Sequence, residues 1–230
     1  MWASLLNKSD MSGYHSSQAP LSPSPGLSVL ILAGGRSTRM GQDKAWLLLD
    51  GQPLVERVVR RVLPLASELI ISTNAPDRFD ELARVLPVPV RLVADLYPQV
   101  GPFAGLHAGL AAAANELVLA LATDLPFVNL DLLRYLIGLA AGYDAVVPLT
   151  PGPNPGRPEL EPLHALYRRT CLPAIERHLA AGDRRVVSFL ADVRVRAVPP
   201  EEIVRFDPDC RSFFNVNTPE EWEEAEHIGK

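Results

Sequence analysis

The residues best suited to chemistry lie together in one segment, residues 32–45, which reads LAGGRSTRMGQDKA. Its glycines let backbone N–H groups approach phosphate oxygens closely. Arg36 and Arg39 add forked hydrogen-bond donors, and Lys44 adds a compact cation. Lys44 is also the only lysine between residues 9 and 229, where every other basic side chain apart from histidine is an arginine. These residue types predict a loop that binds the phosphates of a nucleotide.

Spacing excludes two well-known phosphate-binding loops. A Walker A loop reads G-x-x-x-x-G-K-[ST], whereas here Gly35 and Gly41 are too far apart and Lys44 is followed by Ala45. A dinucleotide-binding loop needs G-x-G-x-x-G, which this chain does not contain. The segment therefore indicates a triphosphate loop of a third kind. On the glycines alone, an ordinary surface loop is the alternative.

Asp124 is the strongest candidate for a metal ligand. It directly follows the apolar run 117–123, which is typical of a buried strand. In an open parallel sheet, ligands bind outside the carboxyl ends of the strands. Mg²⁺ takes one or two carboxylates and completes its shell with water and phosphate oxygens. Asp124 is therefore expected to hold Mg²⁺, or else to cap the segment that leads into Pro126.

The elements that must position these residues alternate between strand and helix. Apolar runs predict strands at residues 27–33, 69–72, 90–94, 117–123, 145–148 and 163–167. Helical spacing predicts helices at residues 54–66, 77–86, 105–115, 129–141 and 171–181, and the capping box of residues 218–221 starts a last one. Short connections between alternating elements indicate right-handed βαβ units. We expect a Rossmann-like three-layer α/β/α fold with a mainly parallel sheet.

Two segments rich in proline interrupt this pattern. Residues 1–26 hold too few apolar side chains to offset the entropy of ordering, so we expect a flexible Ser/Pro-rich tail before a single folded domain at residues 27–230. Residues 151–158 read PGPNPGRP and predict an exposed loop near the site.

Composition and charge exclude several classes of protein. The net charge is −5 and the sequence pI is near 5.6, which argues against nucleic acid or an anionic membrane as a partner. No apolar run approaches the ~18 residues that a membrane helix needs. The two cysteines, Cys171 and Cys210, show no zinc or disulfide spacing, so we expect a reducing cytoplasm.

Five separated motifs give the chain a specific resemblance. The loop LAGG-x-S-x-RMG-x-DKA resembles the signature of the molybdenum cofactor guanylyltransferases, within the nucleotidyltransferase superfamily. The other motifs follow in the family's order: VADLYPQVGPFAGLHAGL at 93–110, ATDLPFV at 122–128, EPLHALYRR at 161–169 and FFNVNTPEE at 213–221. The resemblance covers most of residues 27–225.

Carried over position by position, the resemblance implies three sets of site residues. GTP would be bound by Leu32, Ala33, Gly34, Gly35, Lys44, Asp95 and Asp124, with Ser72 or Asn74 making a contact where some relatives carry an asparagine. The catalytic set would be Lys44, Arg39 and Asp124, and the metal ligand Asp124. Asn215 and Asn217 would lie near the metal or the second substrate. His164 either joins them or has a hydrogen-bonded structural role.

The resemblance implies transfer of GMP from GTP to the phosphate of molybdenum-bound molybdopterin, giving molybdopterin guanine dinucleotide and pyrophosphate. GTP and molybdopterin are then the substrates, and contacts with a molybdoenzyme or a chaperone are left open. One alternative is a cytidylyltransferase of the same fold acting on molybdopterin or another phosphorylated acceptor. Those relatives usually read AAG where this chain reads AGG after Leu32. A second alternative is a non-catalytic nucleotide-binding regulator, although such a protein need not keep both Lys44 and Asp124.

Overall fold

The computed structural model describes residues 26–34, 44–97, 100–152 and 158–228. The predicted tail lies outside these ranges except for Gly26. The part of the phosphate loop that contains Gly35 and Arg39 and most of the proline-rich loop at 151–158 also lie outside them.

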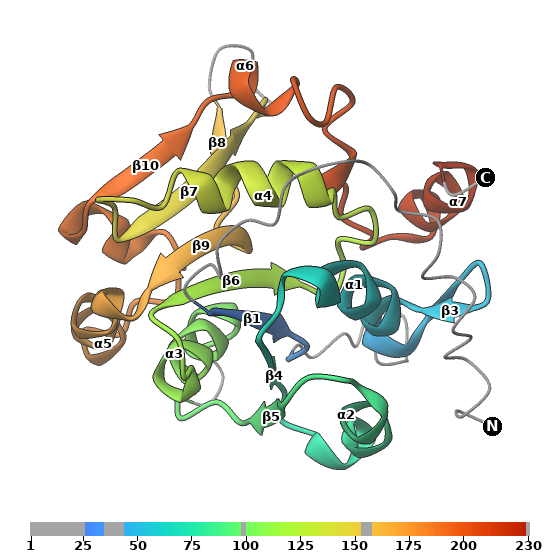
Figure 1. Cartoon of the computed structure of the whole chain (residues 1–230), viewed down its shortest axis with the longest axis horizontal. Helices are drawn as coiled ribbons and strands as arrows, with labels where there is room; N and C mark the ends of the chain where they lie inside the picture. The colour runs from blue at the N-terminus through green and yellow to red at the C-terminus, as the bar shows by residue number, and fades with distance from the viewer. Residues whose placement is uncertain (1–25, 35–43, 98–99, 153–157, 229–230) are drawn as a thin grey trace.

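A sheet of eight strands forms the middle layer, with seven strands in the order β10-β7-β9-β6-β1-β4-β5 and β8 beside β7 (Figure 1). These strands are β1 Leu27–Leu32, β4 Glu68–Ser72, β5 Val90–Val93, β6 Leu117–Ala122, β7 Ala145–Thr150, β8 Glu159–Leu160, β9 His164–Arg168 and β10 Val195–Val198. A separate small hairpin pairs β2 (Leu48–Leu49) with β3 (Gln52–Pro53). The pairs β6-β1, β1-β4, β4-β5 and β7-β10 are parallel.

Helices cover both faces of this sheet. They are α1 Leu54–Val62, α2 Asp80–Val85, α3 Pro102–Ala112, α4 Leu130–Gly138, α5 Leu172–Ala180, α6 Pro200–Ile203 and α7 Pro219–Ile228. Apolar residues of α1 and α4 share one core cluster, and those of α3 and α5 share another. The predicted three-layer, mainly parallel fold is therefore confirmed (Figure 1).

Strand β1 shows why the sheet is buried on both sides. Its side chains alternate, so Val29 and Ile31 enter the α1/α4 core, whereas Leu30 and Leu32 enter the α3/α5 core. All six residues of β1 are buried. Apart from Ser28, the strand is a continuous apolar run, which is typical of a central parallel strand.

One strand runs against the others in the central part of the sheet. β9 is antiparallel to both β6 and β7. The sequence did not predict this reversal, because the proline-rich loop replaces the helix that a parallel crossover would need. As a result, β9 begins at the edge of the sheet where β6 and β7 end.

Local signals fix two helix starts as predicted. The Asn129 side chain accepts hydrogen bonds from the backbone N–H groups of Asp131 and Leu132, at 2.9 and 3.2 Å, at the start of α4. At the start of α7, the Thr218 hydroxyl accepts from the Glu221 N–H at 3.2 Å, and the Glu221 carboxylate accepts from the Thr218 N–H at 2.9 Å.

The start of α3 differs from the prediction. The sequence predicts a helix over residues 105–115, but α3 begins at Pro102 and ends at Ala112. Gly101 adopts a φ of +83°, and Pro102 then occupies the first helical position, where its missing N–H is harmless. This Gly-Pro pair was the overlooked signal.

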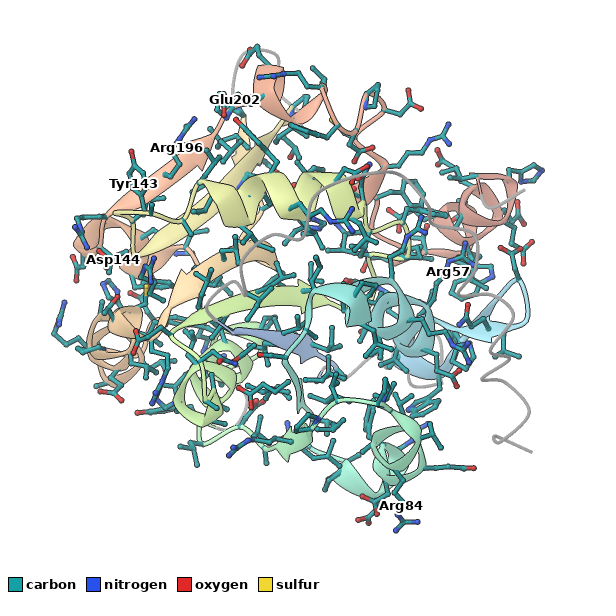
Figure 2. The ribbon with its side chains drawn as sticks, viewed as in Figure 1. Arg57, Arg84, Tyr143, Asp144, Arg196 and Glu202 are labelled. Carbon is teal, nitrogen blue, oxygen red and sulfur yellow. The ribbon has the colours of Figure 1, made fainter. Side chains whose placement is uncertain are left out.

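Ion pairs secure the outer edge of the sheet. Arg196 of β10 contacts Glu202 of α6 at 2.7 Å, and both are labelled in Figure 2. Nearby, the Arg194 guanidinium lies 3.0 Å from the Asp144 carboxylate and holds its pKa down at about 2. No helix in the described ranges is both long and apolar enough to cross a membrane.

Candidate active site

Four parallel strands end level with one another and define the site. Leu32 of β1 pairs with Ala122 of β6 and with Ser72 of β4, and Ser72 pairs with Val93 of β5. The residues that follow these strand ends therefore meet along one edge of the sheet. This is the edge at which open α/β sheets bind ligands.

A cationic side chain bridges two distant segments at this edge. The Lys44 ammonium donates to Asp124 Oδ2 at 2.9 Å and to Asn217 Oδ1 at 2.6 Å. The Val216 N–H donates to the Asp124 carbonyl at 3.0 Å, so backbone pairing holds the two oxygen-bearing residues side by side. The structure thus assembles three residues that the sequence singled out separately.

A cavity of about 180 Å³ lies against this group. It is bordered by Leu32, Ala33, Gly34, Lys44, Ala45, Pro102, Ala122, Thr123, Asp124, Leu163 and Asn217. Typical ligand pockets measure ~300–1,000 Å³, so this cavity accounts for only part of a nucleotide. The Ala33 N–H already donates to the Ser72 carbonyl at 2.9 Å, so this N–H is engaged within the sheet.

A second polar group forms after β4 and β5. The Ser72 hydroxyl lies 3.3 Å from Asp95 Oδ1, and the Asn74 side-chain amide donates to Asp95 Oδ2 at 3.1 Å. The Asp95 N–H donates back to Asn74 Oδ1 at 3.2 Å. Ser72 is only 1% exposed, whereas Asn74 is exposed. Of the two residues left open by the sequence, Asn74 is exposed to solvent, whereas Ser72 is buried beneath Asp95; which of them contacts a nucleotide stays a prediction.

Gly105 of α3 makes this arrangement possible. A Cβ atom at this position would lie 2.7 Å from Leu32 Cδ2, 2.8 Å from Ser72 Oγ and 3.5 Å from Asp95 Oδ1. The absence of a side chain lets α3 pack directly on the strand ends. Sequence reasoning used Gly105 only as a helix boundary; a glycine inside an otherwise alanine-rich helix was the signal for close packing.

His164 lies in the interior. Its side chain is completely buried, and its ring centroid lies 4.7 Å from that of Phe213. Burial lowers the pKa of His164 to about 4, against a smaller opposing effect of the Ser212 backbone. Neither ring nitrogen makes a hydrogen bond of normal geometry to the described residues. Full burial favours a structural role for His164, and its contact with a second substrate stays a prediction.

The two asparagines of the last motif are placed differently. Asn217 borders the small cavity, whereas Asn215 is exposed and donates to the Phe213 carbonyl at 3.4 Å. The predicted contacts of Gly35 and Arg39 lie outside the described residues.

The group around Lys44 suits a hard cation. The described residues contain no cluster of three or more His, Cys, Asp or Glu side chains that could hold a metal by themselves. The Asp124 carboxylate and the Asn217 amide nevertheless point oxygens at one ammonium group. A single carboxylate with a neutral oxygen nearby fits Mg²⁺, which draws its remaining ligands from water and phosphate.

An arginine-lined cavity, of about 650 Å³, lies away from this site. It is bordered by arginines of α1, including Arg57, and by the segment that leads into α4 (Figure 2). None of the site residues expected from the sequence borders it.

Comparison with known proteins agrees with this geometry. The family model described as "MobA-like NTP transferase domain" matches residues 29–197. A probable molybdenum cofactor guanylyltransferase from Peptoclostridium acidaminophilum is 36% identical over 199 residues, which cover 84% of this chain and 86% of that protein. The chain belongs to the molybdenum cofactor guanylyltransferase family.

Two solved structures have the same fold as this chain. The crystal structure of molybdopterin-guanine dinucleotide biosynthesis protein A from Archaeoglobus fulgidus superposes with a TM-score of 0.72 at 30% identity, covering 88% of this chain and 98% of that one. A 4-diphosphocytidyl-2C-methyl-D-erythritol synthase from Anaerococcus prevotii gives 0.68 at 17% identity, covering 89% and 99%, which shows a shared fold. The predicted family and enzyme class are thus confirmed: the protein is a nucleotidyltransferase, of a family that generally uses a divalent metal ion.

Proposed function

We propose that this enzyme transfers GMP from GTP to the phosphate of molybdenum-bound molybdopterin and releases pyrophosphate. The observation that carries the proposal is the meeting of Lys44, Asp124 and Asn217 beside the main chain that follows β1. That arrangement provides a cation for phosphates and a carboxylate for a metal at one point. Membership of the family supplies the substrates.

The triphosphate lies along residues 32–34 and meets Lys44. Without a ligand, the Lys44 ammonium is paired with Asp124 and Asn217. When the triphosphate enters, Lys44 turns to its oxygens, because an ammonium group binds phosphate as a point charge. Asp95, fixed by Ser72 and Asn74, holds the nucleoside end.

Asp124, with Asn217 beside it, is the residue that would hold Mg²⁺. When bound, this ion offsets the charge that develops on the departing pyrophosphate. Lys44 adds to that neutralisation, and Arg39 of the loop has the same role in our proposal. Asn217 keeps its amide oxygen next to Asp124 and so limits where a cation can sit.

The chemical step needs no covalent intermediate. An oxygen of the acceptor phosphate attacks the α-phosphorus of GTP, and the bond to the bridging oxygen of pyrophosphate breaks opposite to it. A phosphate oxygen is already ionised at neutral pH, so no general base is required. The contribution of the protein is to align the two phosphates and to exclude other geometries.

The assay for this proposal supplies each of the four ribonucleoside triphosphates, Mg²⁺ and a molybdopterin-bearing acceptor, and measures pyrophosphate release. GTP is expected to support turnover far better than ATP, CTP or UTP. Preference for CTP would identify a cytidylyltransferase instead, and the absence of release with every nucleotide would indicate a binding protein without catalytic activity.

We also propose the cytoplasm as the compartment of this enzyme. Cys171 and Cys210 are both free thiols in the structure. Free thiols are compatible with a reducing environment.

A further inference from the structure

A further cavity, of about 610 Å³ and therefore larger than the one beside Lys44, opens at the same edge of the sheet as the nucleotide site. β6 and β7 are both antiparallel to β9, so they run in the same direction and end at the same edge. Thr150, the last residue of β7, borders this cavity, as does Glu161, which lies shortly before β9. Its volume is in the range of ordinary small-molecule sites.

The two cavities are bordered by the same two stretches of chain. In the stretch before β9, Glu161 borders the larger cavity and Leu163 borders the small one next to Lys44. In the last motif, Phe214 borders the larger cavity and Asn217 the small one. A ligand that lies across these stretches therefore has one end at the nucleotide site and the other in the larger cavity.

Glu161 is held rigidly at this place. Its N–H donates to the Pro148 carbonyl at 2.9 Å, and its Oε1 accepts the Thr150 hydroxyl at 2.6 Å. Within the described part of the chain, Oε2 has no such partner. Burial, together with the nearby Glu159, raises the pKa of the Glu161 carboxyl above its usual value. A partly desolvated carboxylate is a strong acceptor for a ligand with N–H donors.

The geometry points to Glu161 as the residue that recognises the pterin ring of the acceptor, by accepting hydrogen bonds from its 2-amino and N3–H groups. This inference rests on the proposed function. The 2-amino-4-oxo edge of a pterin presents two adjacent N–H donors, which match the two oxygens of one carboxylate. Phe213 and Phe214 supply apolar surface to the same cavity for the ring itself.

The charges of the two cavities set the orientation of the acceptor. Lys44 attracts the phosphate end to the small cavity, and the carboxylates at the larger cavity repel a phosphate but accept a neutral ring with N–H donors. Among the described residues that border the larger cavity, Arg211 is the one basic side chain, and it is paired with Asp209 at 3.0 Å. The phosphate is thereby directed toward GTP.

Two ring compounds test this recognition without the complete acceptor. Pterin carries the 2-amino group, whereas lumazine has a carbonyl oxygen in its place. Their affinities for the full chain are measured by titration of the ring fluorescence, without GTP. We expect the wild type to bind pterin at least tenfold more tightly than lumazine, because the carbonyl oxygen of lumazine faces the carboxylate.

Glu161→Gln should weaken pterin binding by about ten- to hundredfold, the usual effect of losing a hydrogen bond to a charged group. It should also remove the preference for pterin, because the glutamine amide can donate to the lumazine carbonyl. Glu159→Gln is the matched control: it removes the same charge from the same cavity and should change either affinity less than threefold. The melting temperature and GTP affinity of both variants should match the wild type.

Thr150 is a positioning residue in this scheme, and its replacement gives a second, graded test. Thr150→Val removes the hydroxyl that orients Oε1, and it should reduce the preference for pterin, whereas Thr150→Ser should keep it. No saturable binding of pterin to the wild type, equal affinities for pterin and lumazine, or equal losses in the Glu161 and Glu159 variants would overturn the inference. GMP transfer is measured separately, so a failure of the proposed function would show there and not in the ring titrations.

Discussion

Replacement of His164 by phenylalanine tests whether the last motif packs against β9 as the structure describes. Phenylalanine keeps a ring against Phe213 but cannot be protonated. In the wild type, the buried imidazole has a pKa of about 4, against about 6.5 when it is exposed in the unfolded chain. The folded state therefore binds fewer protons than the unfolded state between these two pH values, and the free energy of unfolding falls as the pH is lowered.

The size of the effect follows from these two pKa values. Each pH unit between them changes the free energy of unfolding by about 1.4 kcal/mol, so this histidine alone should cost about 3 kcal/mol between pH 7 and pH 4. Carboxylates titrate in the same range, but they are common to both proteins and cancel in the difference. The His164→Phe variant should lose about 3 kcal/mol less than the wild type over this range.

The assay is urea unfolding at half-unit pH intervals from 7 to 4, with His227→Gln as the control. His227 is exposed at the end of α7, so its replacement should leave the pH dependence almost unchanged. If the free energy of unfolding depends on pH in the same way for the wild type and His164→Phe, the reasoning is refuted. That result would show that the imidazole is solvated or paired in the folded protein.

Three further substitutions probe the site. Gly105→Ala should destabilise the fold by about 1–3 kcal/mol in urea unfolding, because the added methyl group overlaps Leu32 and Ser72. Calorimetry should show weaker GTP binding by the same variant. The control is Gly138→Ala, which should not destabilise the fold because nothing lies within 4 Å of the added methyl group. Lys44→Ala should lower turnover by about a hundredfold, in analogy with the loss of one preorganised charge-stabilising donor, while near-normal turnover would assign that charge to an arginine of the loop. Asp124→Asn should abolish metal-dependent turnover in a magnesium titration but spare GTP binding in EDTA; wild-type turnover at low magnesium would show that Asp124 is only a cap.

The sequence predicted the scaffold of the site because strand ends and loop glycines are local features. Apolar runs located β1 and β6, and the residues directly after them fall where the fold requires. The direction of β9 could not be obtained in this way. Local patterns describe single elements, whereas strand direction depends on the connection, and residues 151–158 suggest only a loop.

Contacts between distant segments were the other feature that the sequence could not predict. The hydrogen bond from Lys44 to Asn217 joins residues 173 positions apart, and only the family resemblance suggested that both belong to one site. No sequence pattern singled out Glu161 as a site residue. It does stand beside a proline just ahead of a buried strand, where a glutamate is unusual. His164 could face either way on sequence grounds, and its burial depends on Phe213, which lies far away in the chain.

The central claim, transfer of GMP to a pterin phosphate, is tested most directly by following two isotopic labels. GTP labelled at the α-phosphorus and GTP labelled at the γ-phosphorus are each incubated with the enzyme, Mg²⁺ and a molybdopterin-bearing acceptor. The account predicts that the α label appears in the dinucleotide product and the γ label in pyrophosphate, in equal amounts. Appearance of the γ label in the acceptor, or formation of free GMP without a labelled acceptor, would contradict it.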